Sequence, residues 1–208
     1  MNYRYEWGVF LTRAQPPTIG HMESIRQILS ECSKVLVIVG SANKEGTLRN
    51  PFGIGLRMEM MREMIVETFA RDAERVLLRQ LDDLTYENNT DPNNDPLWGE
   101  YLYQTVVGWI HQTKFAYYSG ELVDQSVHWF RDRLYTDVAP VAINTRGIPS
   151  CLSATSVREA IRKKDRGYVR VYCPASVYRK FGLLREILLQ VLAGPKDDFS
   201  AKERGQNV

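Results

Sequence analysis

Apolar residues along this chain follow two alternating spacings. Short apolar runs rich in β-branched and aromatic residues indicate strands at 7–11, 34–40, 75–81, 114–120 and 137–144. Between these runs, apolar residues recur every three or four positions, which is the spacing of a helix with one buried face. Strands that alternate with helices in this way predict an α/β fold, a Rossmann-like parallel sheet of about five strands with helices on both faces.

The helices predicted from this spacing cover 20–31, 56–69, 97–110 and 153–164, with a further one around Val127, Phe130 and Leu134. At the start of the 153–164 helix, Ser156 and Glu159 have the spacing of a capping box, with Ser153 and Thr155 as alternative caps. Beyond Cys173 we expect one or two closing helices, with Pro174 at a first helical position.

The length of 208 residues is enough for one domain with a sizeable core. Residues 1–193 contain no internal repeat and no linker-like stretch, so we expect a single domain there. Residues 194–208 have few apolar side chains to bury, which predicts a disordered tail.

Charge and cysteine content narrow the class of protein. The net charge of +2 is too small to indicate a nucleic-acid partner. The cysteines Cys32, Cys151 and Cys173 lack metal-site spacing, which favours reduced thiols in a cytoplasmic protein. The first residues lack the apolar run of a signal peptide, and no apolar stretch is long enough to span a bilayer. We therefore expect a soluble, cytoplasmic protein without a membrane partner.

Two stretches carry candidate chemistry, and both open a predicted helix. TRAQPPTIGHMESI, at 12–25, follows the first strand and contains Arg13, Gly20 and His21. Ligands of parallel sheets bind beyond the carboxyl ends of the strands, where helix amino termini favour anions. LSATSVR, at 152–158, offers hydroxyl groups and Arg158. Taken alone, the first stretch could equally be a surface turn and the second an ordinary helix cap.

Together the two stretches resemble the (T/H)-x-G-H and I-S-x-T-x-x-R motifs of the nucleotidyltransferase α/β superfamily, with Thr18 at the first position and Leu152 in place of isoleucine. TRAQPPTIGH is similar to the G-R-F-Q-P-x-H-x-G-H of the archaeal-type nicotinamide-nucleotide adenylyltransferases. VGSANKEGTLRNPFGIGLRMEMM, DPLW and YYSG also resemble segments of that family, in the same order. The resemblance covers roughly residues 5–180.

The resemblance implies transfer of an adenylyl group from ATP to nicotinamide mononucleotide, with Mg²⁺ carried by ATP and pyrophosphate. By matched position, His21 would donate to the α-phosphate and Thr18 more weakly to the β-phosphate. Arg13 and Arg158 would hold the β- and γ-phosphates. The remaining ATP contacts would come from the close-approach glycine, a loop arginine and two helix-end hydroxyls, namely Gly20, Arg49, Ser153 and Thr155.

For the acceptor end, the resemblance points to Asp82 or Asp83, whose register is ambiguous by one residue, and to Trp98. Trp98 would stack on the cationic nicotinamide ring or belong to the core, and the two interpretations have equal support. The loop at 82–96 is a candidate lid. Arg57 is interpreted as a salt-bridge partner on a helix face, and Asn50 and Pro51 as residues that shape their loop.

The chain also departs from the family. Ala14 and Pro17 replace bulky residues, and Glu121 stands where relatives often have asparagine. A second, hydrolase domain, as in some relatives, is not expected. Two other functions stay open: a superfamily enzyme for a phosphopantetheine or CTP-linked substrate, and a nucleotide-binding sensor without turnover. The sequence leaves the oligomeric state, including a homo-oligomer, and the preference between nicotinamide and nicotinic acid mononucleotide undecided.

Overall fold

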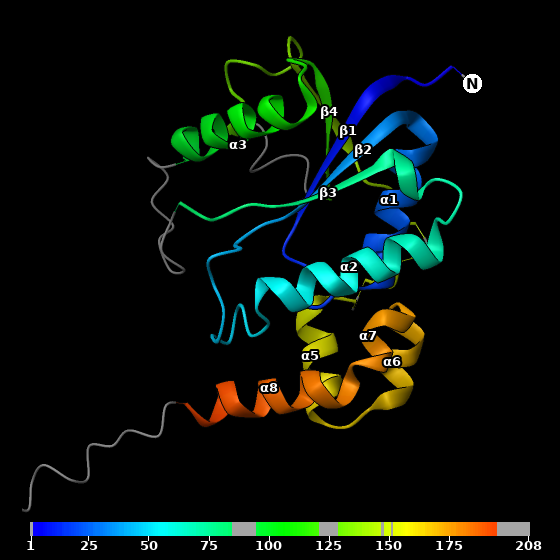
Figure 1. Cartoon of the computed structure of the whole chain (residues 1–208), viewed down its shortest axis with the longest axis vertical. Coiled ribbons are helices and arrows are strands. Elements are labelled where there is room, and N and C mark those ends of the chain that lie inside the picture. The colour runs from blue at the N-terminus through cyan, green and yellow to red at the C-terminus, as the bar shows by residue number, and fades with distance from the viewer. Residues whose placement is uncertain (1, 85–94, 121–128, 147, 151, 195–208) are drawn as a thin grey trace, which may run out of the picture.

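The structure is a computed structural model that describes residues 2–84, 95–120, 129–146, 148–150 and 152–194. Its centre is a five-stranded sheet in the order β3-β2-β1-β4-β5, and every pair of neighbouring strands is parallel (Figure 1). The strands are β1 Tyr5–Thr12, β2 Cys32–Val39, β3 Val76–Gln80, β4 Phe115–Ser119 and β5 Val138–Ala142. All five strands predicted from the apolar runs are confirmed. Pro140 is accommodated because β5 is an edge strand.

Helices cover both faces of this sheet, as the alternating pattern predicts (Figure 1). The helices next to the sheet are α1 Ile19–Glu31, α2 Ile54–Thr68 and α3 Asp95–Ile110, with a short 3₁₀ helix at Ala73–Arg75. The closing helices are α5 Ala154–Arg162, α6 Arg166–Tyr172, α7 Ala175–Arg179 and α8 Phe181–Ala193. Within the described residues, no helix combines the length and the apolar character needed to cross a membrane.

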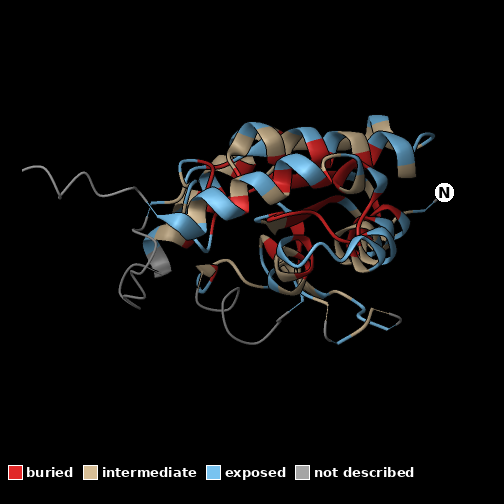
Figure 2. Cartoon of the chain, turned by 90° about the horizontal axis from the view of Figure 1, so that it is seen from below, coloured by how far each residue is buried: buried red, intermediate tan, exposed pale blue. Residues whose placement is uncertain are grey.

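Three apolar clusters hold these layers together, and Figure 2 shows their buried residues on the strands and on the helix faces that meet them. One cluster joins the sheet to α1 and α2, and includes Ile25, Val37 and Met64. A second joins the opposite face to α3, and includes Leu36 and Leu102. The third packs α5–α8 against α2. The closing helices are therefore docked on the domain by an apolar interface of their own.

Three details differ from the sequence-based expectation. Of the segment for which we expected a helix, Trp129 is helical, residues 130–133 form turns and Leu134 forms an isolated bridge with Val138, while Val127 lies outside the described residues. Phe130 is buried against β4 aromatics, so its apolar spacing reflects burial and not a helical turn. Pro174 is the N-cap of α7 and does not occupy the first helical position. The helix α6 was not predicted at all.

Candidate functional site

The turn between β1 and α1 holds His21 by both ring nitrogens. Nδ1 accepts a hydrogen bond from the Thr18 main-chain N–H at 3.0 Å, and the Thr18 hydroxyl oxygen lies 2.9 Å from the same nitrogen. Nε2 lies 2.7 Å from the Thr12 hydroxyl oxygen. Because a main-chain N–H can only donate, Nδ1 carries no proton and the hydrogen of the neutral ring is on Nε2. Burial lowers the pKa of His21 to about 4, so the ring is neutral at pH 7.

Gln15 ties this turn to the loop that precedes α2. Its side chain is buried, donates to the Phe52 carbonyl at 3.1 Å and accepts from the Phe52 N–H at 3.0 Å. Such a two-way pairing imitates the contact of two strands and fixes the distance between the segments. Asn50, Pro51 and Phe52 are themselves buried, in keeping with the expectation that Asn50 and Pro51 shape this loop.

Arg158 brings the second motif to the first. From α5 its guanidinium donates to the Gln15 carbonyl at 2.8 Å, across 143 residues of chain, and to the Thr155 hydroxyl at 3.0 Å. Arg13 is exposed beside it. Burial lowers the pKa of Arg158, and the charge of Arg13 lowers it further. Two predicted phosphate-binding arginines therefore lie within electrostatic reach of each other at the carboxyl end of β1.

Arg57 adds a third positive charge to this end of the sheet. Its guanidinium is fully buried and donates to three main-chain carbonyls, those of Arg13, Gly40 and Ser41, at 2.8–3.0 Å. Burial lowers the pKa of Arg57 to about 10, with the Arg13 charge acting in the same direction and that of Glu45 against it. The interpretation of Arg57 as a salt-bridge partner on a helix face is therefore wrong. Arg57 holds together the chain segments that follow β1 and β2.

The start of α5 is capped by Ser153, one of the alternatives left open above. The Ser153 hydroxyl accepts from the Ser156 N–H at 3.0 Å, and the Ser156 hydroxyl lies 2.9 Å from the Ser153 N–H. The box therefore pairs Ser153 with Ser156, and the pairing of Ser156 with Glu159 is wrong. Glu159 instead forms ion pairs with Arg162 and Lys163. Ser153 and Thr155 remain exposed beside Arg158.

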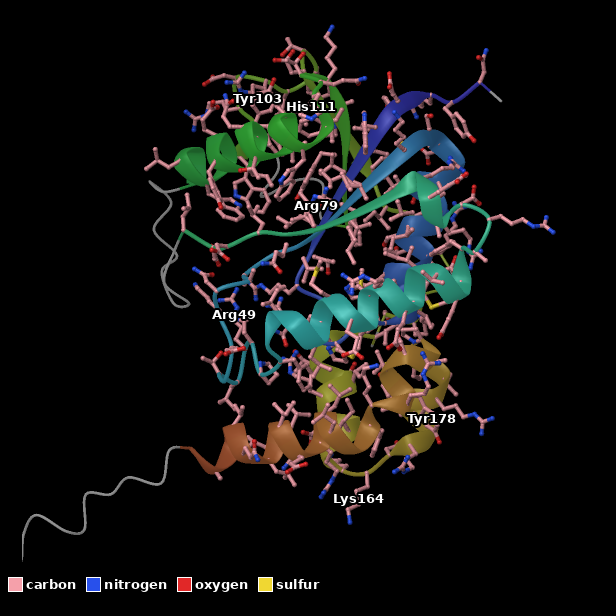
Figure 3. All side chains as sticks on the ribbon, in the orientation of Figure 1. Arg49, Arg79, Tyr103, His111, Lys164 and Tyr178 are labelled. Carbon is pink, nitrogen blue, oxygen red and sulfur yellow. The ribbon has the colours of Figure 1, made fainter. Side chains whose placement is uncertain are left out.

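Arg49 and Gly20 border the same region. Arg49 is exposed on the loop between β2 and α2, beside the beginning of α2 (Figure 3). A Cβ atom at Gly20 would lie 3.3 Å from the Thr18 hydroxyl oxygen and 3.9 Å from the Ile148 side chain. The turn therefore has little space for a side chain at this position.

The acceptor candidates lie after β3 and at the beginning of α3. Asp83 accepts from the Ser41 hydroxyl at 3.3 Å and pairs with Lys44 at 3.4 Å, so it is bound to the loop after β2. Asp82 is exposed. Burial raises the pKa of Tyr101, and the charges of Asp82 and Asp83 raise it further, which places both carboxylates near the first turns of α3.

Trp98, on α3, is half-buried in a group of aromatic side chains. Its ring centroid lies 5.5 Å from that of Tyr101 and 6.2 Å from that of Trp129, and it packs against the cluster that joins α3 to the sheet. Residues 85–94 of the lid candidate at 82–96 lie outside the described residues, as does Glu121, and residues 95–96 belong to α3. Within the described part of the chain, no group of three or more His, Cys, Asp and Glu side chains could hold a metal ion.

Comparison with known proteins places this arrangement in a family. A cytidylyltransferase-like family model matches residues 9–160. The chain is 30% identical over 151 residues to the nicotinamide-nucleotide adenylyltransferase of Pyrococcus abyssi, an alignment that covers 73% of this chain and 70% of that protein. The chain belongs to the cytidylyltransferase-like family, in its nicotinamide-nucleotide adenylyltransferase branch. The family predicted from the two motifs is therefore confirmed.

Other members of the branch show how widely the similarity extends. The nicotinamide/nicotinic acid mononucleotide adenylyltransferase of Acinetobacter baylyi is 27% identical over 158 residues, which cover 76% of each chain. A bifunctional NMN adenylyltransferase/ADP ribose pyrophosphatase from Francisella tularensis, solved with AMP and a manganese ion, has the same fold, with a TM-score of 0.66 at 18% identity. The match covers 91% of this chain, which spans only 52% of the Francisella protein.

The sequence did not predict the contacts that three residues make in this site. Gln15 and Arg57 stand inside the segments that resemble the family, and Thr12 stands where the quoted family pattern has glycine. The feature of the sequence that could have pointed to these residues is their position inside segments that resemble the family. Their partners, however, are mostly main-chain atoms of distant residues, which no spacing in the sequence can reveal.

Proposed function

We propose that this chain transfers the adenylyl group of ATP to nicotinamide mononucleotide, with formation of NAD and pyrophosphate. The observation that carries this proposal is the 2.8 Å hydrogen bond from Arg158 to the Gln15 carbonyl, which joins the two motifs of the family at one site. The family membership supports the same reaction.

In this reaction an oxygen of the mononucleotide phosphate forms a bond to the α-phosphorus of ATP. The bond from that phosphorus to the bridging oxygen breaks, and its electron pair leaves with pyrophosphate. The attacking phosphate is already ionised at pH 7, so no residue has to act as a general base. The protein has to position two anions and stabilise the charge that develops between them.

The residues of the turn and of α5 divide this task. His21 presents a neutral ring whose Nε2 hydrogen is directed at the Thr12 hydroxyl oxygen, so the ring would support the donors that face the α-phosphate. Arg13 and Arg158 would hold the β- and γ-phosphates, and Arg49 would approach them from its loop. Ser153, Thr155 and the main chain around Gly20 would supply further donors at two helix amino termini. The buried charge of Arg57 would add to the positive potential beneath them.

The divalent metal enters this scheme as part of the nucleotide substrate. We propose Mg²⁺, because the triphosphate carries more negative charge than the arginines neutralise. Removal of free divalent metal with EDTA should abolish turnover, and Mg²⁺ in excess should restore it.

The acceptor would bind between the segment after β3 and the beginning of α3. Trp98 offers an indole face to the cationic nicotinamide ring, and Asp82 or Asp83 offers a carboxylate to its amide. A carboxylate would favour the amide over the acid of nicotinic acid mononucleotide, because two negative charges repel each other.

The test is turnover by the purified full chain with ATP, Mg²⁺ and nicotinamide mononucleotide. We expect NAD and pyrophosphate in equal amounts. Parallel reactions replace the acceptor with nicotinic acid mononucleotide or phosphopantetheine, and ATP with CTP. Rapid adenylylation of phosphopantetheine without formation of NAD would contradict the proposal, and nucleotide binding without any product would indicate a sensor.

A further inference from the structure

The Thr12 hydroxyl at the end of β1 has a hydrogen that the described part of the protein does not use. Its oxygen accepts from the Ala14 N–H at 3.3 Å and from His21 Nε2 at 2.7 Å. The second bond runs in this direction because Nδ1 of His21 is the acceptor for Thr18, which leaves the ring hydrogen on Nε2. A hydroxyl oxygen has two lone pairs, and both are therefore occupied.

The hydroxyl hydrogen of Thr12 can consequently only be donated, and the described residues offer it no acceptor at hydrogen-bond distance. Thr12 is half-buried and not sealed in the core, so its side chain is accessible to a ligand. The acceptor that fits is an anionic oxygen, since the neighbouring groups are the neutral imidazole of His21 and the guanidinium groups around Arg13.

Thr18 cannot provide this donor, although it occupies the motif position to which the resemblance assigns a phosphate contact. Thr18 is only 4% exposed, and its hydroxyl points to Nδ1 of His21 at 2.9 Å. Since Nδ1 carries no proton, the Thr18 hydroxyl is the donor of that contact. The hydrogen of Thr18 is thus used to orient the ring, whereas that of Thr12 is left for a ligand.

We infer that Thr12 is a phosphate-binding catalytic residue that donates its hydroxyl hydrogen to a non-bridging oxygen of the ATP α-phosphate. This inference rests on the proposed adenylyl transfer. His21 would then act through a chain of hydrogen bonds, from the Thr18 N–H to Nδ1, from Nε2–H to the Thr12 oxygen, and from the Thr12 O–H to the phosphate. Each bond in such a chain polarises the next and strengthens the last donor.

No proton is transferred in this step. The Thr12 O–H and His21 N–H bonds stay intact while the acceptor phosphate bonds to the α-phosphorus and pyrophosphate leaves with the electron pair of the bond that breaks. The donor of the chain faces the oxygens on which negative charge increases in the transition state. Its contribution should therefore be larger in turnover than in ATP binding.

The test compares the parent with Thr12→Val, which keeps the shape and removes the hydroxyl, and with Thr12→Ser, which keeps the hydroxyl. Thr12→Val should lower kcat about 10- to 100-fold and raise the dissociation constant of MgATP only about threefold. Thr12→Ser should stay within about threefold of the parent kcat. Thr105→Val is the matched control, because among the described residues the Thr105 hydroxyl bonds only to the Tyr101 carbonyl within α3.

A double variant tests the chain of hydrogen bonds. If Thr12 and His21 act as one unit, Thr12→Val combined with His21→Ala should lose no more kcat than His21→Ala alone, within about threefold. Losses that multiply would overturn the inference. Parent-like turnover by Thr12→Val would also overturn the inference. The Thr12 hydroxyl would then only accept the hydrogen bond of His21 Nε2 while ATP is absent.

The inference and the proposed function can fail separately. If the parent forms no NAD, the proposed function is contradicted, and the dissociation constant of MgATP then tests the role of Thr12. An unchanged dissociation constant in Thr12→Val overturns that role, and a higher dissociation constant supports it. Low activity of Thr12→Val without recovery in Thr12→Ser would assign the loss to packing and overturn the inference.

Discussion

Hydrogen bonds to main-chain atoms join the segments of the proposed ATP end, whereas Trp98 at the proposed acceptor end is held by aromatic packing. Gln15, Arg57 and Arg158 each bind carbonyl groups of segments that are far away in the sequence. Trp98 instead lies among rings at centroid distances of 5.5–6.2 Å, and its neighbour Leu97 is exposed. Directional bonds tolerate small changes of geometry far less than ring contacts do. In the proposed function, the reacting phosphates would therefore meet strictly positioned segments, whereas the ring that would select the acceptor has more freedom to adapt.

If this contrast is correct, loss of Arg57 should produce the largest effect. Arg57→Leu leaves three buried carbonyls without their donor, so the free energy of unfolding should fall by about 3 kcal/mol or more. ATP should also no longer raise the melting temperature. Urea unfolding measures the first effect and a thermal-shift titration the second. Arg62→Leu, on the exposed face of the same helix, is the control; an equal loss in both variants would show that the buried bonds have no special weight.

Loss of His21 should affect turnover and spare binding. His21→Ala should lower kcat about 100-fold, the scale of one lost transition-state donor, because the arginines still hold the triphosphate. The dissociation constant of MgATP should change by less than about threefold. Steady-state kinetics and titration calorimetry separate the two quantities. His111→Ala, at the exposed end of α3 (Figure 3), should match the parent. Normal kcat with poor ATP binding would reverse the role of His21.

At the acceptor end the expected effect is smaller and confined to one substrate. Trp98→Ala should raise KM for nicotinamide mononucleotide about tenfold, since stacking of a cationic ring on indole is worth about 1–2 kcal/mol. KM for ATP should stay nearly constant, and Leu97→Ala should behave like the parent. A much lower melting temperature with both constants intact would instead make Trp98 a core residue of α3.

The last expected effect is a dependence of stability on pH that originates at His21. The pKa of His21 is about 4 in the folded chain and about 6.5 when unfolded, so between these values only the unfolded chain gains the proton. Stability is therefore complete above about pH 6.5 and falls as the pH is lowered through this window, by about 2 kcal/mol at pH 5. Urea unfolding at pH 7 and pH 5 should show a smaller decrease for His21→Gln than for the parent. Equal decreases would place the titrating group elsewhere.

The five strands, the helices next to them and the family could be predicted from the sequence, because each depends on local patterns. Continuous apolar runs mark buried parallel strands, and the two motifs lie within short stretches of chain. The sequence could not identify the N-cap of α5, because it offers three hydroxyl side chains within four residues. The structure identifies Ser153, which has the extended backbone of an N-cap. The turns at 130–133 were not predicted for a related reason: burial of Phe130 in an aromatic cluster gives the same apolar spacing as a helix.

What the sequence alone determined is thus the order of strands and helices and the presence of a nucleotidyltransferase-type pair of motifs. Only the tertiary structure decided which side chains serve the ligand and which serve the protein. Arg57 looks in the sequence like a surface arginine, but its side chain is buried and donates to three carbonyls. Thr18 occupies a phosphate-binding motif position, but its hydroxyl is directed at His21. The physical reason is that hydrogen-bond partners are set by distance and direction in space. The hydrogen of Thr12 becomes available only because folding brings His21 and Ala14 to both lone pairs of its oxygen.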